Sequence, residues 1–146
     1  MNLEQARQYL DRNGIELILA QFVDIHGAAK TKAVPAAHLD MIVQDGAGFA
    51  GFAVWGMGMG PHGPDFMARG DLSTLTKIGW LPKFGRIACT GHVNGKPYEY
   101  DSRFVCQRAL DRVQEELGCI AQTGLEPEFF LLRRNPETGM SGAGFP

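Results

Sequence analysis

The sequence predicts an α+β fold in which a small mixed sheet is crossed by a helix, and a further helix and strand begin a second unit. Segments with apolar residues at helical spacing occur between runs rich in Ile, Leu, Val and Phe. Turn residues separate these segments, as at residues 24–27 and at Asn94-Gly95. Neither an internal repeat nor a low-complexity tract interrupts this order.

The first part of the chain predicts a helix, a hairpin and a short second helix. Residues 1–13 carry an apolar stripe of Leu3, Ala6 and Leu10, and Gly14 stands where a glycine commonly ends a helix. Residues 16–24 and 28–34 are the two expected strands of the hairpin. Pro35 then opens a helix over residues 36–44, because proline suits a first helical turn.

Residues 45–63 form a segment in which glycine recurs among Phe, Trp and Met side chains, with neither helix nor strand periodicity. A flexible linker would be polar and poor in aromatic residues. We therefore predict a long loop that is ordered by packing, either on its own domain or on a neighbouring subunit. No Gly-x-Gly-x-x-Gly opens onto a helix here, so phosphate binding is the weaker interpretation.

The next segments predict two strands and a long helix. Residues 64–71 are read as a polar connection, and residues 72–80 and 86–93 as strands. Asp101 and Ser102 are suited to cap a helix over residues 103–117, which Gly118 would end. Its expected apolar stripe consists of Phe104, Ala109, Leu110, Val113 and Leu117.

Residues 124–132 read as a buried strand that carries two carboxylates, Glu126 and Glu128. Residues two apart on a strand point to the same face, with Cβ atoms roughly 6 to 7 Å apart. That spacing suits two divalent cations about 3.5 to 4 Å apart. Oxygen ligands favour Mg²⁺ or Mn²⁺ over Zn²⁺. The alternative is a solvated edge strand with two surface glutamates, which Pro127 favours.

Composition limits the function classes. The 146 residues suffice for one domain with a core, and the net charge of −2 predicts no nucleic-acid partner. Three cysteines without C-x-x-C spacing indicate reduced, mostly packed thiols rather than a disulfide framework or a zinc site. Without a signal pattern or a long apolar run, we expect a cytoplasmic protein that does not contact a membrane.

Two blocks in the second half resemble the glutamine synthetase family. Residues 124–132, Gly-Leu-Glu-Pro-Glu-Phe-Phe-Leu-Leu, resemble its Gly-x-Glu-x-Glu-Phe-Phe-Leu strand of metal ligands. Upstream, Asp101-Ser-Arg103 is similar to the Asp-Pro-Arg start of a family helix, with Ser102 in place of the proline.

Two further blocks lie in the first half, in matching order and spacing. Residues 64–74 are similar to the family's Ser-Asp-Met and Pro-Asp-x-Ser-Thr sequences. Residues 48–54, Gly-Phe-Ala-Gly-Phe-Ala-Val, stand where the family carries Phe-Asp-Gly-Ser-Ser-Ile. The resemblance covers nearly all of this chain but roughly the first third of a family member, so we expect the chain to be the front part of a longer protein.

The resemblance implies a β-grasp domain over residues 1–97 and, over residues 98–146, the beginning of an α/β catalytic domain. It also implies a ring-shaped homo-oligomer, in which the loop at residues 45–63 covers the active site of a neighbouring subunit. By position, Glu126 would bind the metal at the nucleotide phosphates and Glu128 the metal nearer the amine site. The implied substrates are ATP, glutamate and an amine, joined through a γ-glutamyl phosphate with Mg²⁺ or Mn²⁺.

One departure from the family pattern bears on the amine. Ala50 replaces the usual aspartate, and Phe52 and Ala53 replace the serines that follow. A charge at about 4 Å is worth roughly 1 kcal/mol in water and about 4 kcal/mol at an effective dielectric constant of 20, so ammonium should bind less well. An amine site formed by Ala50, Phe52, Ala53 and Trp55 would suit methylamine.

The sequence thus resembles the type III-like branch of the superfamily, which includes γ-glutamylmethylamide synthetases, and implies a glutamate–amine ligase. Ordinary glutamine synthesis from ammonia is the alternative within the same class. A non-catalytic β-grasp module for assembly or regulation is the alternative of another class. It fits the isolated 146 residues, which we expect to be inactive alone because they carry no nucleotide-binding loop and none of the family's later ligands.

Overall fold

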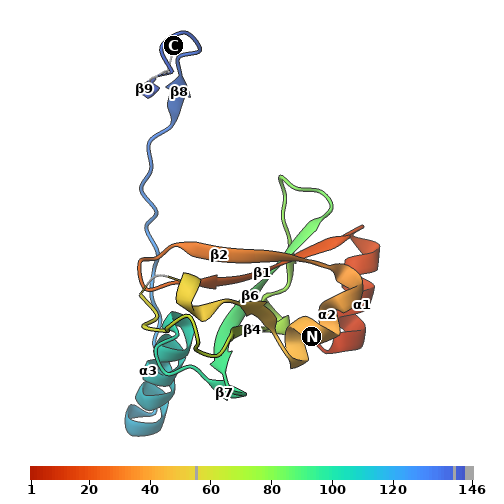
Figure 1. The fold of residues 1–146 in the computed structure, drawn as a ribbon, viewed down its shortest axis with the longest axis vertical. Helices are drawn as coiled ribbons and strands as arrows, with labels where there is room; N and C mark the ends of the chain where they lie inside the picture. The colour runs from red at the N-terminus through yellow and green to blue at the C-terminus, as the bar shows by residue number, and fades with distance from the viewer. Residues whose placement is uncertain (55, 140, 144–146) are drawn as a thin grey trace.

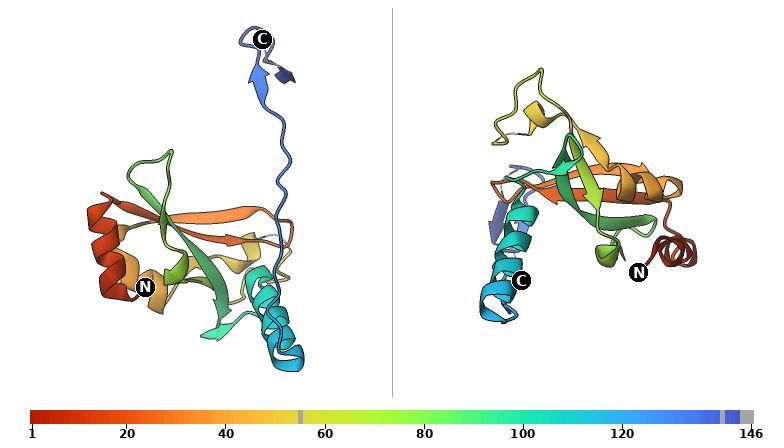
Figure 2. Two further views of the ribbon diagram at one scale, coloured as in Figure 1. Left: turned by 180° about the vertical axis from the view of Figure 1, so that it is seen from behind. Right: turned by 90° about the horizontal axis from the view of Figure 1, so that it is seen from below.

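The computed structural model describes residues 1–54, 56–139 and 141–143 and confirms an α+β fold (Figure 1). The sheet and the helices α1 and α2 form one body, α3 lies beside it, and the last residues extend away (Figures 1 and 2). In chain order the elements are α1 (Leu3–Arg12), β1 (Leu17–Val23), β2 (Ala29–Pro35), α2 (Leu39–Gln44), β3 (Ala47–Phe49), β4 (Phe66–Gly70), β5 (Thr76–Lys77), β6 (Phe84–Val93), β7 (Lys96–Pro97), α3 (Ser102–Leu117), β8 (Leu132–Arg134) and β9 (Ser141–Ala143).

The main sheet is mixed and runs in the order β2-β1-β6-β4-β3. Strands β1 and β6 pair in parallel at its centre, while β2 and β4 join them antiparallel on either side. The short strands β5 and β7 pair with the two ends of β6. Strand β6 is therefore the element on which the sheet is built.

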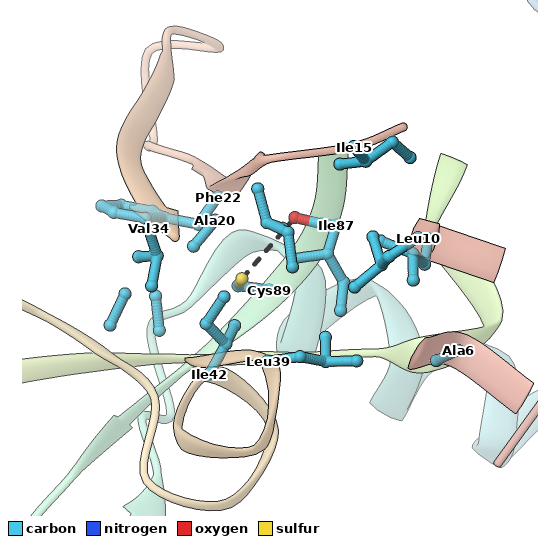
Figure 3. Packing of buried hydrophobic residues seen from close by; sticks show 14 of the residues in the cluster. Ala6, Leu10, Ile15, Ala20, Phe22, Val34, Leu39, Ile42, Ile87 and Cys89 are labelled. Carbon is cyan, nitrogen blue, oxygen red and sulfur yellow. Dashed lines mark hydrogen bonds between the residues drawn. The ribbon is translucent and has the colours of Figure 1, made fainter. Parts of the chain in front are cut away.

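The core lies on one face of this sheet, under α1 and α2. Burial alternates along β1 and β6, as expected for strands with one covered face. Figure 3 shows side chains from the sheet meeting those of the two helices. Cys89 lies among them with its thiol directed to the carbonyl of Ile87, and burial raises the pKa of this thiol to about 12. Cys89 is thus a packed thiol, whereas Cys106 and Cys119 are exposed, so the expectation that most of the cysteines are packed is wrong.

The first helix and the hairpin follow the sequence prediction closely. Asn2 and Gln5 form a reciprocal capping box at the start of α1, and Gly14 takes the left-handed conformation beyond its end. In the β1–β2 turn the Asp24 carboxylate accepts from the amide N–H groups of Ala28 and His26. The bond from Ala28 is the largest cause that holds the pKa of Asp24 below its ordinary value, against the opposing effect of burial. The predicted second helix begins with a 3₁₀ turn, Ala36–His38, before α2.

Two sequence predictions in the middle of the chain are wrong. Residues 64–71 are not only a connection, because Phe66–Gly70 is strand β4, with Phe66 and Ala68 buried. Residues 72–80 are not one strand, and only Thr76–Lys77 pairs with β6. The physical reason is Asp71, whose carboxylate accepts from the N–H and hydroxyl of Ser73 and turns the chain into a 3₁₀ helix, Leu72–Thr74.

The predictions beyond residue 80 are confirmed up to the end of α3. Strand β6 covers the expected residues 86–93 and begins two residues earlier. Asn94 and Gly95 both have positive φ, as a type I′ turn requires. Asp101 caps α3 through the N–H of Phe104, and Gly118 ends it in the left-handed conformation. Most of the expected apolar stripe on α3 is exposed, so the helix has no buried residue in this chain.

The predicted strand at residues 124–132 is not formed over most of its length. Of these nine residues, only Leu132 lies in a strand. It is the first residue of β8, which pairs with β9 in a separate two-stranded hairpin. The preceding residues are extended away from the sheet (Figure 1). A strand needs a hydrogen-bonded neighbour, and within the described ranges none lies beside residues 124–131. Leu125, Phe129 and Phe130 are consequently exposed rather than buried.

Candidate functional site

The turn at residues 50–53 contains three of the four residues predicted to line an amine site. Gly51–Ala53 is a 3₁₀ turn that follows β3 directly, and Ala50 is its first cap. Ala50, Phe52 and Ala53 are exposed, with 55% of the Phe52 surface accessible, whereas Gly51 and Val54 are buried. Trp55 lies outside the described residues. The turn thus presents small and aromatic apolar side chains, and none of its residues carries a charge.

The start of the loop is held by contacts to β1 and β2. Lys32 of β2 donates from its ammonium group to the carbonyl oxygen of Gly48, and this cation lies 5.2 Å from the centre of the Phe49 ring. The same ring meets Phe22 of β1 edge-on at 5.0 Å. These contacts fix the direction in which the chain enters the turn at residues 50–53.

The far part of the loop packs on the same domain. The Met59 side chain lies so close to Gly51 that a Cβ atom there would collide with its sulfur. At Gly56, a Cβ atom would collide with the Ile25 side chain from the β1–β2 turn. The loop was predicted to be ordered by packing, and Gly56 and Met57 do pack on the loop's own domain. Packing of the loop on a neighbouring subunit stays a prediction.

Two of the recognised sequence blocks touch each other in the structure. Arg103, at the start of α3, pairs with Asp71 at 2.6 Å, and the Asp101 side chain beside it is buried. The hydroxyl of Ser73 is the largest cause that lowers the pKa of Asp71, and the charge of Arg103 adds to this effect against burial. The Asp-Ser-Arg block therefore joins α3 to the segment that follows β4.

Glu126 and Glu128 are both exposed in the extended segment after α3. Across the described ranges, no group of three or more acidic, histidine or cysteine side chains gathers in a way that could hold a metal ion, around these glutamates or elsewhere. The donor chemistry nevertheless fits Mg²⁺, which commonly takes one or two carboxylates and completes its shell with water and phosphate oxygens. The two glutamates thus remain candidate ligands, and the strand that was predicted to carry them is not formed in the described structure.

Sequence reasoning missed the contacts that hold the loop. Lys32 appeared as one polar residue of a strand, and Tyr98 as part of a connection between elements. Tyr98 donates from its hydroxyl to the carbonyl oxygen of Met57 at 2.6 Å, across 41 residues of sequence. No local pattern signals such a pairing, because it depends on the sheet that brings β7 beside the loop.

The fold and the sequence blocks together resemble an N-terminal β-grasp-like domain of the kind that the glutamine synthetase family carries. Solved structures agree with this class. A chain described as a GmaS/ADP complex is similar with a TM-score of 0.72 and 32% identity over 76% of this chain and 26% of its own. A chain described as apo GmaS without ligand has a TM-score of 0.71 and 33% identity, over 75% of this chain and 26% of its own.

Curated relatives narrow the class. A glutamate–methylamine ligase of Methyloversatilis universalis is 55% identical over 135 residues, which is 92% of this chain and 30% of the relative. A glutamine synthetase of Methanococcus maripaludis is 35% identical over 144 residues, 91% of this chain and 32% of the relative. Protein-family models were compared as well, and none matches. The resemblance to the glutamine synthetase superfamily, and to its glutamate–methylamine ligases in particular, is confirmed.

The chain spans about a third of the length of these curated relatives. One of these relatives is named a ligase and the other a synthetase. Separately, none of the described helices of this chain is long and apolar enough to span a membrane.

Proposed function

We propose that this chain is part of an ATP-dependent ligase that joins the γ-carboxylate of glutamate to a small amine, with methylamine favoured. The observation that carries the proposal is the exposed turn at residues 50–53, which presents Ala50 where the resemblance to the glutamine synthetase family implies an aspartate. The 55% identity to a glutamate–methylamine ligase, against 35% to a glutamine synthetase, supports the choice of amine.

The preference follows from what the turn offers an amine. Both ammonium and methylammonium are cations, so the absence of a carboxylate weakens the attraction of both. The methyl group is the difference, and burying it against Phe52 and Ala53 is worth about 0.8 kcal/mol, or roughly fourfold in affinity. A pocket that fits the methyl group tightly would discriminate by about 10-fold or more.

The chemistry has two steps. A γ-carboxylate oxygen of glutamate attacks the terminal phosphorus of ATP, so that ADP leaves and γ-glutamyl phosphate forms. The nitrogen of the deprotonated amine then attacks the acyl carbon, and phosphate leaves. In this proposal the turn at residues 50–53 reaches the active site of a neighbouring subunit in a ring-shaped homo-oligomer, and covers the amine while water is excluded.

Glu126 and Glu128 are proposed to hold Mg²⁺ or Mn²⁺, Glu126 towards the nucleotide and Glu128 towards the amine site. The ions would neutralise charge on the transferring phosphoryl group. We also propose that the β-grasp domain ends at residue 97 and that the catalytic domain begins at residue 98, between β7 and α3.

The test is glutamate-dependent phosphate release by the full-length protein with ATP and Mg²⁺, in parallel with methylamine, ethylamine, ammonium or no amine. Release that is greatest with methylamine supports the proposal. Release that is greatest with ammonium would support glutamine synthesis instead, which is the activity in the names of the relatives at 35% identity. No glutamate-dependent release would favour the non-catalytic β-grasp module.

The metal assignment has its own test. Glu126→Gln and Glu128→Gln should each raise the Mg²⁺ concentration needed for half-maximal phosphate release, because each removes one anionic ligand. Glu115→Gln is the matched control, since Glu115 is an exposed glutamate on α3. A metal requirement that is the same in all three variants would contradict the assignment.

A further inference from the structure

Tyr98 lies between the sheet and the start of α3 and contacts both. Its ring meets the buried Phe66 ring edge-on at 6.1 Å and the Tyr100 ring at 5.6 Å. Its own N–H donates to the carbonyl of Gly91 in β6, and its carbonyl accepts from the N–H of Asp101, the cap of α3. The position of the Tyr98 hydroxyl is therefore set by the sheet and by the helix start.

The hydroxyl of Tyr98 reaches into the loop at residues 45–63, where it donates to the carbonyl oxygen of Met57 at 2.6 Å. Burial raises the pKa of this hydroxyl, so it stays protonated and able to donate at neutral pH. Gly56 and Met57 also line a pocket together with Tyr100 and Asp101. The loop is thus seated directly on the junction between β7 and α3.

Backbone hydrogen bonds connect Met57 to the turn that presents Ala50. The N–H of Met57 donates to the carbonyl of Val54 at 3.3 Å, and the N–H of Val54 to that of Gly51 at 3.2 Å. The N–H of Ala53 donates to the carbonyl of Ala50 at 2.9 Å. Each bond ties a residue to one three positions earlier, so a displacement at Met57 is passed back along successive tight turns.

We propose that Tyr98 is a positioning residue for the amine site: its hydroxyl fixes the Met57 end of this series of bonds and so sets the place of the turn at residues 50–53. The inference rests on the proposed function, in which that turn contacts the amine. In that proposed function the turn contacts the amine and neither glutamate nor ATP. Loss of the Tyr98 hydroxyl should therefore weaken binding of the amine and leave binding of glutamate and ATP unchanged.

Tyr98→Phe in the full-length protein tests this, because it removes the donor and keeps the ring. A typical net hydrogen-bond contribution corresponds to a change of about fivefold, so we expect the KM for methylamine to rise by about that factor. The KM values for ATP and glutamate should stay within about twofold. In addition, amide hydrogen exchange in residues 51–59 should become faster, while exchange in β1, Leu17–Val23, stays unchanged and shows that the sheet remains folded.

Tyr9→Phe is the matched control. The Tyr9 hydroxyl is also half-buried and bonds to a backbone group, accepting from the N–H of Lys77 at 3.0 Å, but this contact lies far from the loop in sequence, between α1 and β5. If loss of any such hydroxyl merely loosened the domain, Tyr9→Phe would raise the KM for methylamine as well. That result would overturn the positioning role.

The other outcomes separate this inference from the proposed function. Unchanged loop exchange in Tyr98→Phe overturns the inference, whatever the activity. Faster loop exchange with an unchanged KM for methylamine overturns the positioning role, while the amine series on the unmodified protein still decides the function. Activity that depends on ammonium rather than methylamine, with its KM raised in Tyr98→Phe, contradicts the choice of amine but supports the role of Tyr98.

Discussion

Gly70 at the end of β4 lies where the sheet meets α2, and Gly70→Ala is expected to destabilise the domain. A Cβ atom there would lie 2.6 Å from Cδ1 of Ile87 and 3.0 Å from Cγ2 of Ile42. Carbon atoms prefer separations of about 3.5 to 4.0 Å, so both side chains would have to retreat by roughly 0.5 to 1 Å. Both isoleucines are fully buried, and there is no solvent into which they can move.

Overpacking of this kind typically costs about 1 to 3 kcal/mol. With a denaturant dependence of about 2 kcal/mol per M, a loss of 2 kcal/mol lowers the midpoint of urea unfolding by about 1 M. Far-UV circular dichroism gives this midpoint. Gly79→Ala is the control, because a Cβ atom at Gly79 would meet nothing within 4 Å and its φ is not positive. Equal midpoints for the two variants would refute the packing argument.

Three further predictions concern charge, reactivity and specificity. The pKa of Asp24 is lower in the folded than in the unfolded state, so its ionised carboxylate stabilises the fold at pH values above the unfolded-state pKa of about 3.9. This stabilisation is lost as the pH falls through the folded-state pKa. The difference in unfolding free energy between the native protein and Asp24→Asn, measured by urea unfolding, should therefore become smaller below about pH 4. The Cys89 thiol, with a pKa of about 12, should resist iodoacetamide at pH 8 until the protein unfolds, while the exposed Cys106 reacts, as peptide mass spectrometry would show. Ala50→Asp should raise the kcat/KM for ammonium by about fivefold or more, because the added carboxylate attracts the cation by at least about 1 kcal/mol. An unchanged kcat/KM would show that Ala50 does not contact the amine.

The sequence predicted best those features that depend on neighbouring residues. The ends of α1 and α3 follow from glycine in the left-handed conformation and from the Asp101 cap, and the turn after β6 follows from Asn94-Gly95. Each is a short-range effect of backbone conformation or of one side chain on an amide a few residues away.

Features that depend on distant partners were missed or misplaced. Strand β4 is five residues long and ends in Arg69-Gly70, so its alternation is too short to stand out. It is a strand because β6 and β3 pair with it on both sides. Residues 124–131 show the opposite case: their sequence has a strong strand pattern, but they form no ladder because no strand in the described part of the chain lies beside them.

For the candidate site, sequence motifs identified the residues but not the contacts that hold them in place. The resemblance identified Ala50, Phe52 and Ala53 as a group, and the structure places them on one exposed turn. The contacts from Lys32 and Tyr98 that hold this turn join residues 16 and 41 positions apart in the chain. Long-range pairs of this kind are set by the topology of the sheet, which no local pattern encodes.

Some residues of the turn at residues 50–54 are buried and others are exposed, and this difference determines how amine preference can change. Gly51 and Val54 face inward, where Met59 and the core leave no room for larger side chains, whereas Ala50, Phe52 and Ala53 face outward. Substitutions at the outward positions alter the surface offered to an amine without changing the packing below it. A shift between an aspartate that attracts ammonium and an alanine that accepts a methyl group therefore requires no repacking of the core. Under the proposed function, specificity in this domain is set by exposed side chains on a turn whose backbone is fixed by Lys32 and Tyr98.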